Sequence, residues 1–198
     1  MPVDWRERYQ TGETPWEKGK PHPELPFLLS EHRGLVVEAE NILVPGCGFG
    51  HDANLISSIA KGQVFGLDVA DEAIGQAKER YSGEQRSWVV GDLFESEGNY
   101  DLVFEHTFFC AIPVERRSDY VATMARLIPQ GGHLLALFFL NPDHKGEEGP
   151  PFGVTVDELK GFFEGAFEMI WSQPPSKTFE AREGDGRELS ILWRRLGD

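Results

Sequence analysis

The feature that most constrains this chain is a glycine-rich turn within the segment Asn41–Asp52, which reads NILVPGCGFGHD. The apolar run at 42–44 is typical of a buried parallel strand, and residues 51–60 have the composition of a helix with an acid in its first turn. Three glycines on alternate positions lie between them: Gly46, Gly48 and Gly50. Glycine adopts backbone angles that other residues resist, and it lets a ligand approach the main chain. A strand, a glycine turn and a helix in this order open a nucleotide-binding α/β unit.

The spacing of the glycines distinguishes between nucleotide-binding turns. A dinucleotide turn has the pattern G-x-G-x-x-G, which from Gly46 requires glycine at the position where this chain has His51. The pattern G-x-G-x-G instead resembles the first motif of S-adenosylmethionine-dependent methyltransferases. A tight turn in some other α/β protein is the alternative interpretation.

A carboxylate downstream supports a ligand at this turn. A second apolar strand, residues 63–67, ends at Asp68, 20 residues after Gly48. At this separation a carboxylate accepts hydrogen bonds from ribose hydroxyls. Capping of the helix that begins at Asp71 is a second role open to Asp68, and the two roles are compatible. Turn and acid together predict an adenosine-type ligand.

Composition limits the partners of the chain. Its 198 residues, with 40% hydrophobic and 26% charged side chains, predict a single globular domain over 1–198. Nineteen basic and 33 acidic residues give a net charge of −14, without a Lys/Arg stripe. Binding to a phosphate backbone requires clustered basic residues, so nucleic acid is not expected as a partner. A small-molecule substrate is expected instead.

Two cysteines, Cys47 and Cys110, indicate neither a disulfide framework nor a zinc site, and no metal is expected. The N-terminus is polar and proline-rich, without an apolar signal core. No segment approaches the about 18 uninterrupted apolar residues of a membrane span. We therefore expect a cytoplasmic protein without a membrane partner, as a monomer or weak dimer.

Strand and helix patterns alternate along the whole chain, without repeats or linkers. Helices are expected at 5–9, 24–32, 51–60, 71–81, 117–127 and 156–163, with Gly34 at the C′ position of the second. Strands are expected at 42–44, 63–68, 88–90, 102–104, 133–140, 167–171 and 189–193. The alternation predicts an α/β fold: a three-layer, Rossmann-like, doubly wound sheet of seven mostly parallel strands, the last antiparallel.

Ligands in such sheets bind beyond the carboxyl ends of the strands. Three acids end three consecutive strands: Asp68, Asp92 and Glu105. Asp92, with Leu93 and Phe94, is predicted to hold an adenine ring, because a carboxylate accepts from its amino group and apolar side chains cover its faces. A turn residue after Gly91 is the alternative role for Asp92.

The N-terminal residues 1–34 are predicted to form an arm that closes over the ligand. Three aromatic residues, Trp5, Tyr9 and Trp16, lie among glycine and proline in a segment where chains are usually poorly ordered. They need an anchor, which is either the ligand or the protein core. Packing in the core is the alternative to a lid.

The chain resembles the thiopurine S-methyltransferases and their relatives, the plant-type methyl halide and thiol methyltransferases. The resemblance runs from Trp5 to nearly the end of the chain. The motifs that carry it are Trp5-x3-Tyr9-x6-Trp16 with Thr14-Pro15-Trp16-Glu17-x-Gly19, Val44-Pro45-Gly46-Cys47-Gly48, Gly66-Leu67-Asp68, Tyr100-Asp101-Leu102-Val103-Phe104-Glu105, Phe108-Phe109-Cys110-Ala111-Ile112, and His144 leading into Gly149-Pro150-Pro151-Phe152. The Thr-Pro-Trp, Phe-Phe-Cys-Ala-Ile and Gly-Pro-Pro-Phe segments are more specific than the glycine turn, which all class I methyltransferases share.

The resemblance implies S-adenosylmethionine as cofactor, S-adenosylhomocysteine as product, and methyl transfer to soft nucleophiles such as thiols and halides. The cofactor-binding residues that it implies are Trp5, Tyr9, Trp16, Gly46, Cys47, Gly48, Asp68, Val69, Asp92, Leu93, Phe94, Glu105 and His106. The substrate-binding residues are Trp16, Phe108, Phe109, Arg117, His144, Pro151 and Phe152. Tyr9 stands where the plant members usually have tryptophan, and Glu105-His106 replaces a frequent Asp-Tyr pair.

Arg117 and His106 are the candidate catalytic residues. A guanidinium at Arg117 would hold an anionic nucleophile or lower the pKa of a thiol, whereas a surface arginine at the start of a helix is its other interpretation. His106 or Glu105 would act as general base if the acceptor were an oxygen or nitrogen nucleophile. An O- or N-methyltransferase and a non-catalytic cofactor-binding protein are therefore the alternatives to a methyltransferase for soft nucleophiles.

Overall fold

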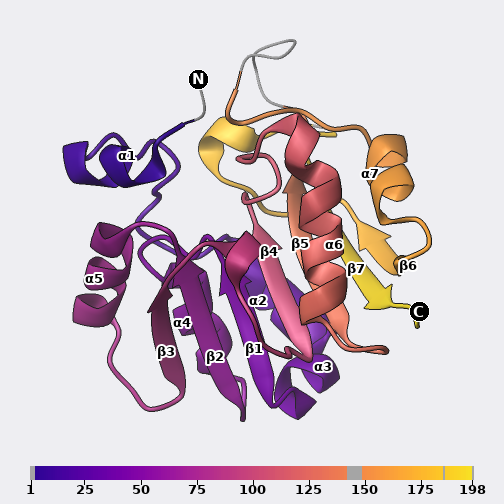
Figure 1. The fold of residues 1–198 in the computed structure, drawn as a ribbon, viewed down its shortest axis with the longest axis horizontal. Coiled ribbons are helices and arrows are strands. Elements are labelled where there is room, and N and C mark those ends of the chain that lie inside the picture. The colour runs from indigo at the N-terminus through magenta and orange to yellow at the C-terminus, as the bar shows by residue number, and fades with distance from the viewer. Residues whose placement is uncertain (1–2, 142–148, 185, 198) are drawn as a thin grey trace. The chain divides into compact units, whose positions relative to one another are not determined.

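The computed structural model describes residues 3–141, 149–184 and 186–197 (Figure 1). The chain divides into two compact units, residues 1–97 and 98–198, and each is described by itself. The expectation of a single domain over 1–198 stays a prediction. Along the described ranges, no helix combines the length and apolar character needed to cross a membrane.

The first unit contains a three-stranded parallel sheet with strand order β3-β2-β1 (Figure 1). Its elements are α1 (Trp5–Thr11), α2 (Leu25–Glu31), α3 (Arg33–Glu38), β1 (Asn41–Pro45), α4 (His51–Ser57), β2 (Gln63–Asp68), α5 (Asp71–Arg80), β3 (Arg86–Val90) and the 3-10 turn η1 (Leu93–Glu95). Ile42 of β1 and Val64 of β2 are paired and are fully buried. The arm helix α1 lies beside α5.

A tryptophan explains two of the glycines in this unit. A Cβ atom on Gly66 would lie 2.5 Å from the ring of Trp88, and one on Gly50 would also lie 2.5 Å from it. The ring is fixed in place because its Nε1 donates a hydrogen bond of 3.1 Å to the carbonyl of Tyr81. Gly50, which has a φ of 83°, therefore makes room for a side chain of β3 as well as forming the turn.

One expected helix end is wrong. Gly34 was expected at the C′ position of a helix over 24–32, but α2 ends at Glu31 and Gly34 lies inside α3. His32 is both the C-cap of α2 and the N-cap of α3. The chain changes direction between the two helices at His32, without a left-handed glycine.

The second unit contains a four-stranded sheet with strand order β4-β5-β7-β6. Its elements are β4 (Leu102–His106), η2 (Val114–Arg116), α6 (Arg117–Leu127), β5 (His133–Phe139), α7 (Val156–Phe163), β6 (Phe167–Gln173), η3 (Glu180–Arg182) and β7 (Glu188–Arg195). β4 and β5 are parallel, and β7 is antiparallel to both β5 and β6. The expected fold class, seven mostly parallel strands with the last strand antiparallel, is confirmed.

Aromatic rings fill the core of the second unit. Phe163 of α7 stacks on Trp193 of β7 with ring centroids 4.5 Å apart. Tyr120 and Phe138 meet the Phe163 ring edge to face, Phe109 meets it at a tilt, and all three are almost fully buried. Thr155 caps α7, and its capping box with Glu158 is complete, as its position before the helix predicts.

The contact between Gly66 and Trp88 gives a test of the first unit. Gly66→Ala forces the Trp88 ring to shift, and we expect it to lower the free energy of unfolding by about 1–3 kcal/mol. Gly75→Ala in α5 is the matched control, because a Cβ there meets nothing within 4 Å. It should be neutral or stabilising by about 0.5–1 kcal/mol. Urea unfolding measures both, and equal stability of the two variants would contradict the packing of Trp88.

Candidate functional site

The glycine turn is held in shape by Asp68. Gly46, Gly48 and Gly50 all have positive φ, of 59°, 53° and 83°. One carboxylate oxygen of Asp68 accepts from the Gly48 amide at 2.9 Å, and the other accepts from the Ala70 amide at 3.0 Å. A side chain at the end of β2 therefore fixes the turn that follows β1.

Burial and hydrogen bonding shift the pKa of Asp68 in opposite directions. The residue is 7% exposed, and burial raises the pKa of its carboxyl, while the amides of Ala70 and Gly48 act to lower it. Each bound oxygen has a second lone pair. The expected hydrogen bond from Asp68 to a ribose is compatible with this geometry and stays a prediction.

The three aromatic residues of the arm contact one another. Trp16 donates from Nε1 to the Tyr9 hydroxyl at 3.1 Å, and its ring meets that of Trp5 edge to face at 5.2 Å. None of the three is fully buried. Tyr9 also contacts Phe49, inside the glycine turn, with ring centroids 5.6 Å apart. The aromatic residues therefore form a cluster at the turn and are not part of the buried core.

The arm also touches the backbone around the turn. A Cβ atom on Gly48 would lie 3.1 Å from the Tyr9 hydroxyl, so the absence of a side chain allows this approach. Burial and the nearby Asp68 raise the pKa of the Tyr9 hydroxyl, which stays protonated. Arg6 donates from Nε to the carbonyl of Val69 at 3.0 Å. Hydrogen bonds and rings thus connect the arm to residues that follow both β1 and β2.

Asp92 follows β3 and forms the N-cap of η1. Its Oδ1 accepts from the Phe94 amide at 2.9 Å, and its side chain is exposed. Leu93 is 2% exposed, so its side chain belongs to the core, while Phe94 is half-buried. Of the two expected apolar walls for an adenine, Phe94 is the one with accessible surface.

In the second unit, Glu105 holds the segment that follows β4. Its Oε1 accepts from the amides of Phe108 at 2.8 Å and Phe109 at 3.1 Å. Thr107, between them, has a φ of 62°, which is unusual for a residue other than glycine. Two hydrogen bonds to one oxygen stabilise this sharp bend.

The second carboxylate oxygen of Glu105, Oε2, is buried. Among the described residues, Oε2 of Glu105 has no hydrogen-bond partner, and neither has the buried hydroxyl of Tyr120. Burial raises the pKa of the Glu105 carboxyl from 4.5 to about 7, although the Phe109 and Phe108 amides and His106 act in the opposite direction. Burial and the Glu105 carboxylate raise the pKa of the Tyr120 hydroxyl well above its ordinary value. The charge of Glu105 therefore changes near neutral pH.

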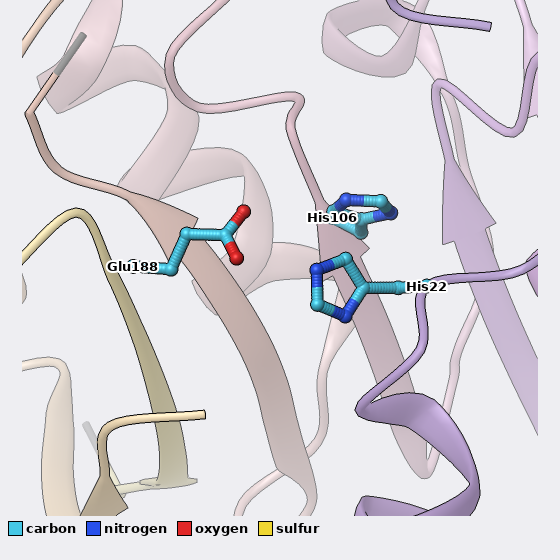
Figure 2. Close-up of side chains that lie close together, drawn as sticks. All are labelled: His22, His106 and Glu188. Carbon is cyan, nitrogen blue, oxygen red and sulfur yellow. The ribbon is translucent and has the colours of Figure 1, made fainter. Parts of the chain in front are cut away.

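His106 lies beside a buried ion pair. Figure 2 shows it with Glu188 of β7, and also draws His22 of the first unit. Arg182 lies 3.3 Å from Nε2 of His106 and 3.1 Å from a carboxylate oxygen of Glu188. Its guanidinium also covers the ring of Phe139 at 4.8 Å. Because a guanidinium only donates, Nε2 of His106 acts as acceptor in this contact.

Arg117 is a buried residue at the start of α6, so its interpretation as a surface arginine is wrong. It is 2% exposed, and its guanidinium lies over the ring of Phe109 at 4.9 Å. It donates to the carbonyls of Phe152 at 3.2 Å and Gly153 at 2.9 Å. The Phe152 amide in turn donates to the Cys110 carbonyl at 2.7 Å. These bonds connect the Phe-Phe-Cys-Ala-Ile segment to the Gly-Pro-Pro-Phe loop.

Several expected substrate-binding residues meet at this connection. Phe109 belongs to the buried aromatic core, whereas Phe108, Pro151 and Phe152 are half-buried. His144 lies outside the described residues. The structure thus groups most of the expected cofactor residues around the glycine turn of the first unit. In the second unit it places Glu105 and His106 at the end of β4, and the expected substrate residues other than Trp16 and His144 in α6 and in the segments that follow β4 and β5.

Two features of the site were missed from sequence. The glycine at position 66, inside a strand pattern, was a signal of close approach by another group, here Trp88. The ion pair of Arg182 and Glu188 beside His106 had no such signal, because it depends on the approach of residues from η3 and β7.

Comparisons with known proteins agree on one family. The family model described as thiopurine S-methyltransferase matches residues 2–186. The probable thiol methyltransferase 2 of Arabidopsis thaliana is 32% identical over 162 residues, which cover 79% of this chain and 69% of that protein. Thiocyanate methyltransferase 1 of Brassica oleracea is 33% identical over 158 residues, 77% of this chain and 67% of that protein.

A solved structure extends the likeness of fold to nearly the whole chain. The N-methyltransferase NodS of Bradyrhizobium japonicum WM9, in complex with S-adenosylhomocysteine, superposes with a TM-score of 0.69 at 16% identity. The match covers 96% of this chain and 98% of NodS. At this identity the likeness concerns the fold alone.

Burial of Glu105 predicts a pH dependence of stability. A carboxyl whose pKa rises from 4.5 to about 7 on folding favours the folded state at acid pH, and that contribution is lost as the pH rises through 7. The free energy of unfolding, relative to Glu105→Gln, should fall by about 3 kcal/mol between about pH 4 and pH 8. Urea unfolding over this range measures it. The exposed Glu115→Gln is the control, and a constant difference between wild type and Glu105→Gln would contradict the assignment.

Proposed function

Since the chain belongs to the thiopurine S-methyltransferase family and is an S-adenosylmethionine-dependent methyltransferase, we propose that its acceptors are small soft nucleophiles: thiols, thiopurine-like thiols, halides or related anions. The observation that carries the proposal is the engagement of both candidate bases. His106 uses Nε2 against Arg182, and Glu105 is fully buried with one oxygen on two amides. A site arranged in this way suits an acceptor that needs little or no deprotonation.

The first unit has residues that fit the cofactor. Alternate glycines with positive φ leave the main chain of the turn bare, and the backbone of Gly46 is exposed. Asp68 and Asp92 offer carboxylates after β2 and β3, and Phe94 offers an aromatic face. When bound, the cofactor supplies a methyl group that its positively charged sulfur makes electrophilic. The turn, the two acids and Phe94 would bind and orient it.

The arm is proposed to close over the cofactor. Trp5, Tyr9 and Trp16 form a cluster beside the glycine turn, with half-buried rings. Aromatic faces next to a sulfonium contribute about 0.5–2 kcal/mol of cation–π attraction. Closure also excludes water from the acceptor, which a soft anion tolerates better than a strongly hydrated hydroxyl.

Residues in the segments that follow β4 and β5 are proposed to bind the acceptor. Phe108, Pro151 and Phe152 supply apolar surface, and Arg117 fixes their segments by its bonds to the carbonyls of Phe152 and Gly153. Holding nucleophile and methyl group in line contributes up to roughly 7–11 kcal/mol. Halides carry no proton, and thiols with a pKa of about 8.5 are partly ionised at neutral pH. Orientation, and not proton transfer, is therefore the main task of these residues.

The choice of acceptor can be tested by comparing a thiol with iodide. We expect kcat/KM for the thiol, divided by that for iodide, to rise with pH until the thiol is ionised and then to level off. Both reactions use the same enzyme, so the ratio cancels the titrations of the enzyme. Because iodide has no proton to lose, the remaining pH dependence is that of the thiol. Formation of S-adenosylhomocysteine between about pH 6 and pH 9 measures both reactions.

An opposite result would support the alternative. If only alcohols or amines are methylated, and the activity vanishes in His106→Ala, then His106 is a general base and the enzyme is an O- or N-methyltransferase. Binding of S-adenosylmethionine without transfer to any of these acceptors would favour a cofactor-binding protein.

Arg117 provides a second test of the acceptor site. Arg117→Ala removes two hydrogen bonds from a charged donor to residues 152–153, and we expect kcat/KM for the acceptor to fall about 10- to 100-fold. KM for S-adenosylmethionine should change by less than about twofold, because this residue orders the acceptor segments. Arg126→Ala, exposed on the same helix, is the control. An effect of Arg117→Ala on cofactor KM alone would contradict the proposed role.

A further inference from the structure

His51 occupies the first position of α4, directly after the glycine turn, and both of its ring nitrogens have partners. Nε2 lies 2.8 Å from a carboxylate oxygen of Glu17, and Nδ1 lies 2.6 Å from the Tyr81 hydroxyl. The residue is 8% exposed. Glu17 belongs to the arm and Tyr81 to the end of α5, so the imidazole connects the arm to the sheet-covering helices of its unit.

Glu17 has a second hydrogen-bond partner besides His51. The carboxylate oxygen that meets His51 also accepts from the amide of Gly19, two residues further along the chain. Burial acts to raise the pKa of Glu17, but the bonds from His51 and Gly19 outweigh it, and the pKa is lowered. Glu17 therefore stays a carboxylate at neutral pH, and its bond to His51 is charge-assisted.

The next residue of α4, Asp52, has a second hydrogen bond with the N-terminal segment. Asp52 accepts from the amide of His22 at 2.8 Å. Two consecutive residues of α4 thus hold both ends of the segment 17–22. Residues 5–16, the part of the arm that carries the aromatic cluster, precede Glu17 in the chain. Their own contacts near the turn are those of Tyr9 and Arg6 already described.

We propose that His51 is a positioning residue that holds the arm in place through its contact with Glu17, a contact called the latch below. The latch thereby sets how long the cofactor and its product stay bound. The proposal rests on the proposed closure of the arm over the cofactor. It gives a role to the residue that stands where a dinucleotide turn has glycine.

The chemistry of the two partners keeps the latch closed in either protonation state of His51. In the neutral imidazole, Nε2–H donates to Glu17 and Nδ1 accepts from the Tyr81 hydroxyl. In the imidazolium both nitrogens donate, and the Tyr81 hydroxyl becomes the acceptor. Breaking the latch therefore requires loss of the Glu17 contact, not a change in the charge of His51.

Two amide replacements separate the latch from packing. In His51→Gln the amide nitrogen reaches the position of Nε2 and keeps a donor for Glu17. In His51→Asn the shorter side chain reaches only the position of Nδ1, so the Tyr81 contact is kept and the Glu17 contact is lost. Glu17→Gln removes the charge from the other side of the bond, at a residue that is less buried than His51. Glu13→Gln is the matched control, because Glu13 forms an exposed pair with Arg8 in the same arm.

The experiment measures dissociation of S-adenosylhomocysteine from the full chain by stopped-flow tryptophan fluorescence. We expect the dissociation rate to rise about 10- to 100-fold in His51→Asn, as for loss of a hydrogen bond to a charged group. In Glu17→Gln the amide oxygen still accepts from His51 but the charge is lost, so the rate should rise about 5- to 10-fold. His51→Gln and Glu13→Gln should stay within about threefold of wild type. With product bound, amides of residues 5–16 should exchange hydrogen faster in His51→Asn and, to a smaller extent, in Glu17→Gln, but not in His51→Gln.

The outcomes separate this inference from the proposed function. If wild type binds S-adenosylhomocysteine but Glu17→Gln releases it at the wild-type rate, the latch is overturned while the proposed function stands. Equal acceleration in His51→Asn and His51→Gln assigns the effect to packing and also overturns the latch. If wild type binds neither S-adenosylhomocysteine nor S-adenosylmethionine, both proposals fail. Thermal unfolding of each variant shows whether it is folded, and Glu17→Gln decides if the His51 variants are not.

Discussion

The hydrogen bond from the Gly48 amide to Asp68 is the interaction on which the arrangement of the first unit depends. It connects the turn after β1 to the end of β2 and holds Gly48 in a left-handed conformation at a φ of 53°. Because Gly48 has no side chain, the Tyr9 hydroxyl can approach it, and Tyr9 in turn accepts from Trp16. The bond between the two strand ends therefore helps to position the arm, together with the contacts of Arg6 with Val69 and of Glu17 with His51.

Carboxylates also accept from loop amides after β3 and at the end of β4. Asp92 accepts from the Phe94 amide, and Glu105 accepts from the amides of Phe108 and Phe109. Each acid thus holds the loop that a ligand would meet, in addition to any contact with the ligand itself. Acids at three consecutive strand ends were attributed to a ligand with several donor groups, and holding the loops is a second physical reason for the same pattern. The two reasons are compatible, because a carboxylate can accept more than two hydrogen bonds.

Elements of this fold could be predicted where the signal is local. Apolar runs located all seven strands, and the periodicity of residues 71–81 and 117–127 located α5 and α6 to within one residue. Gly34 was misplaced because a glycine after a helix is only a preference, and His32 joins α2 to α3 without one. The room that Gly50 and Gly66 make for Trp88, and the ion pair beside His106, depend on residues brought together by folding. Local composition therefore predicts the helices and strands better than it predicts the contacts between them.

The three acids differ in how their charge is balanced, and this difference assigns them different tasks. Both oxygens of Asp68 accept amide hydrogen bonds, while Asp92 is exposed to water, so each has compensation for its charge. Glu105 is fully buried, with one oxygen bonded twice and the other without a partner in the described part of the chain. Its pKa of about 7 places a change of charge within the physiological range, at the residue that holds the Phe108–Phe109 bend. In the proposed enzyme the acid that holds the acceptor segments, Glu105, is therefore the one whose charge changes near neutral pH.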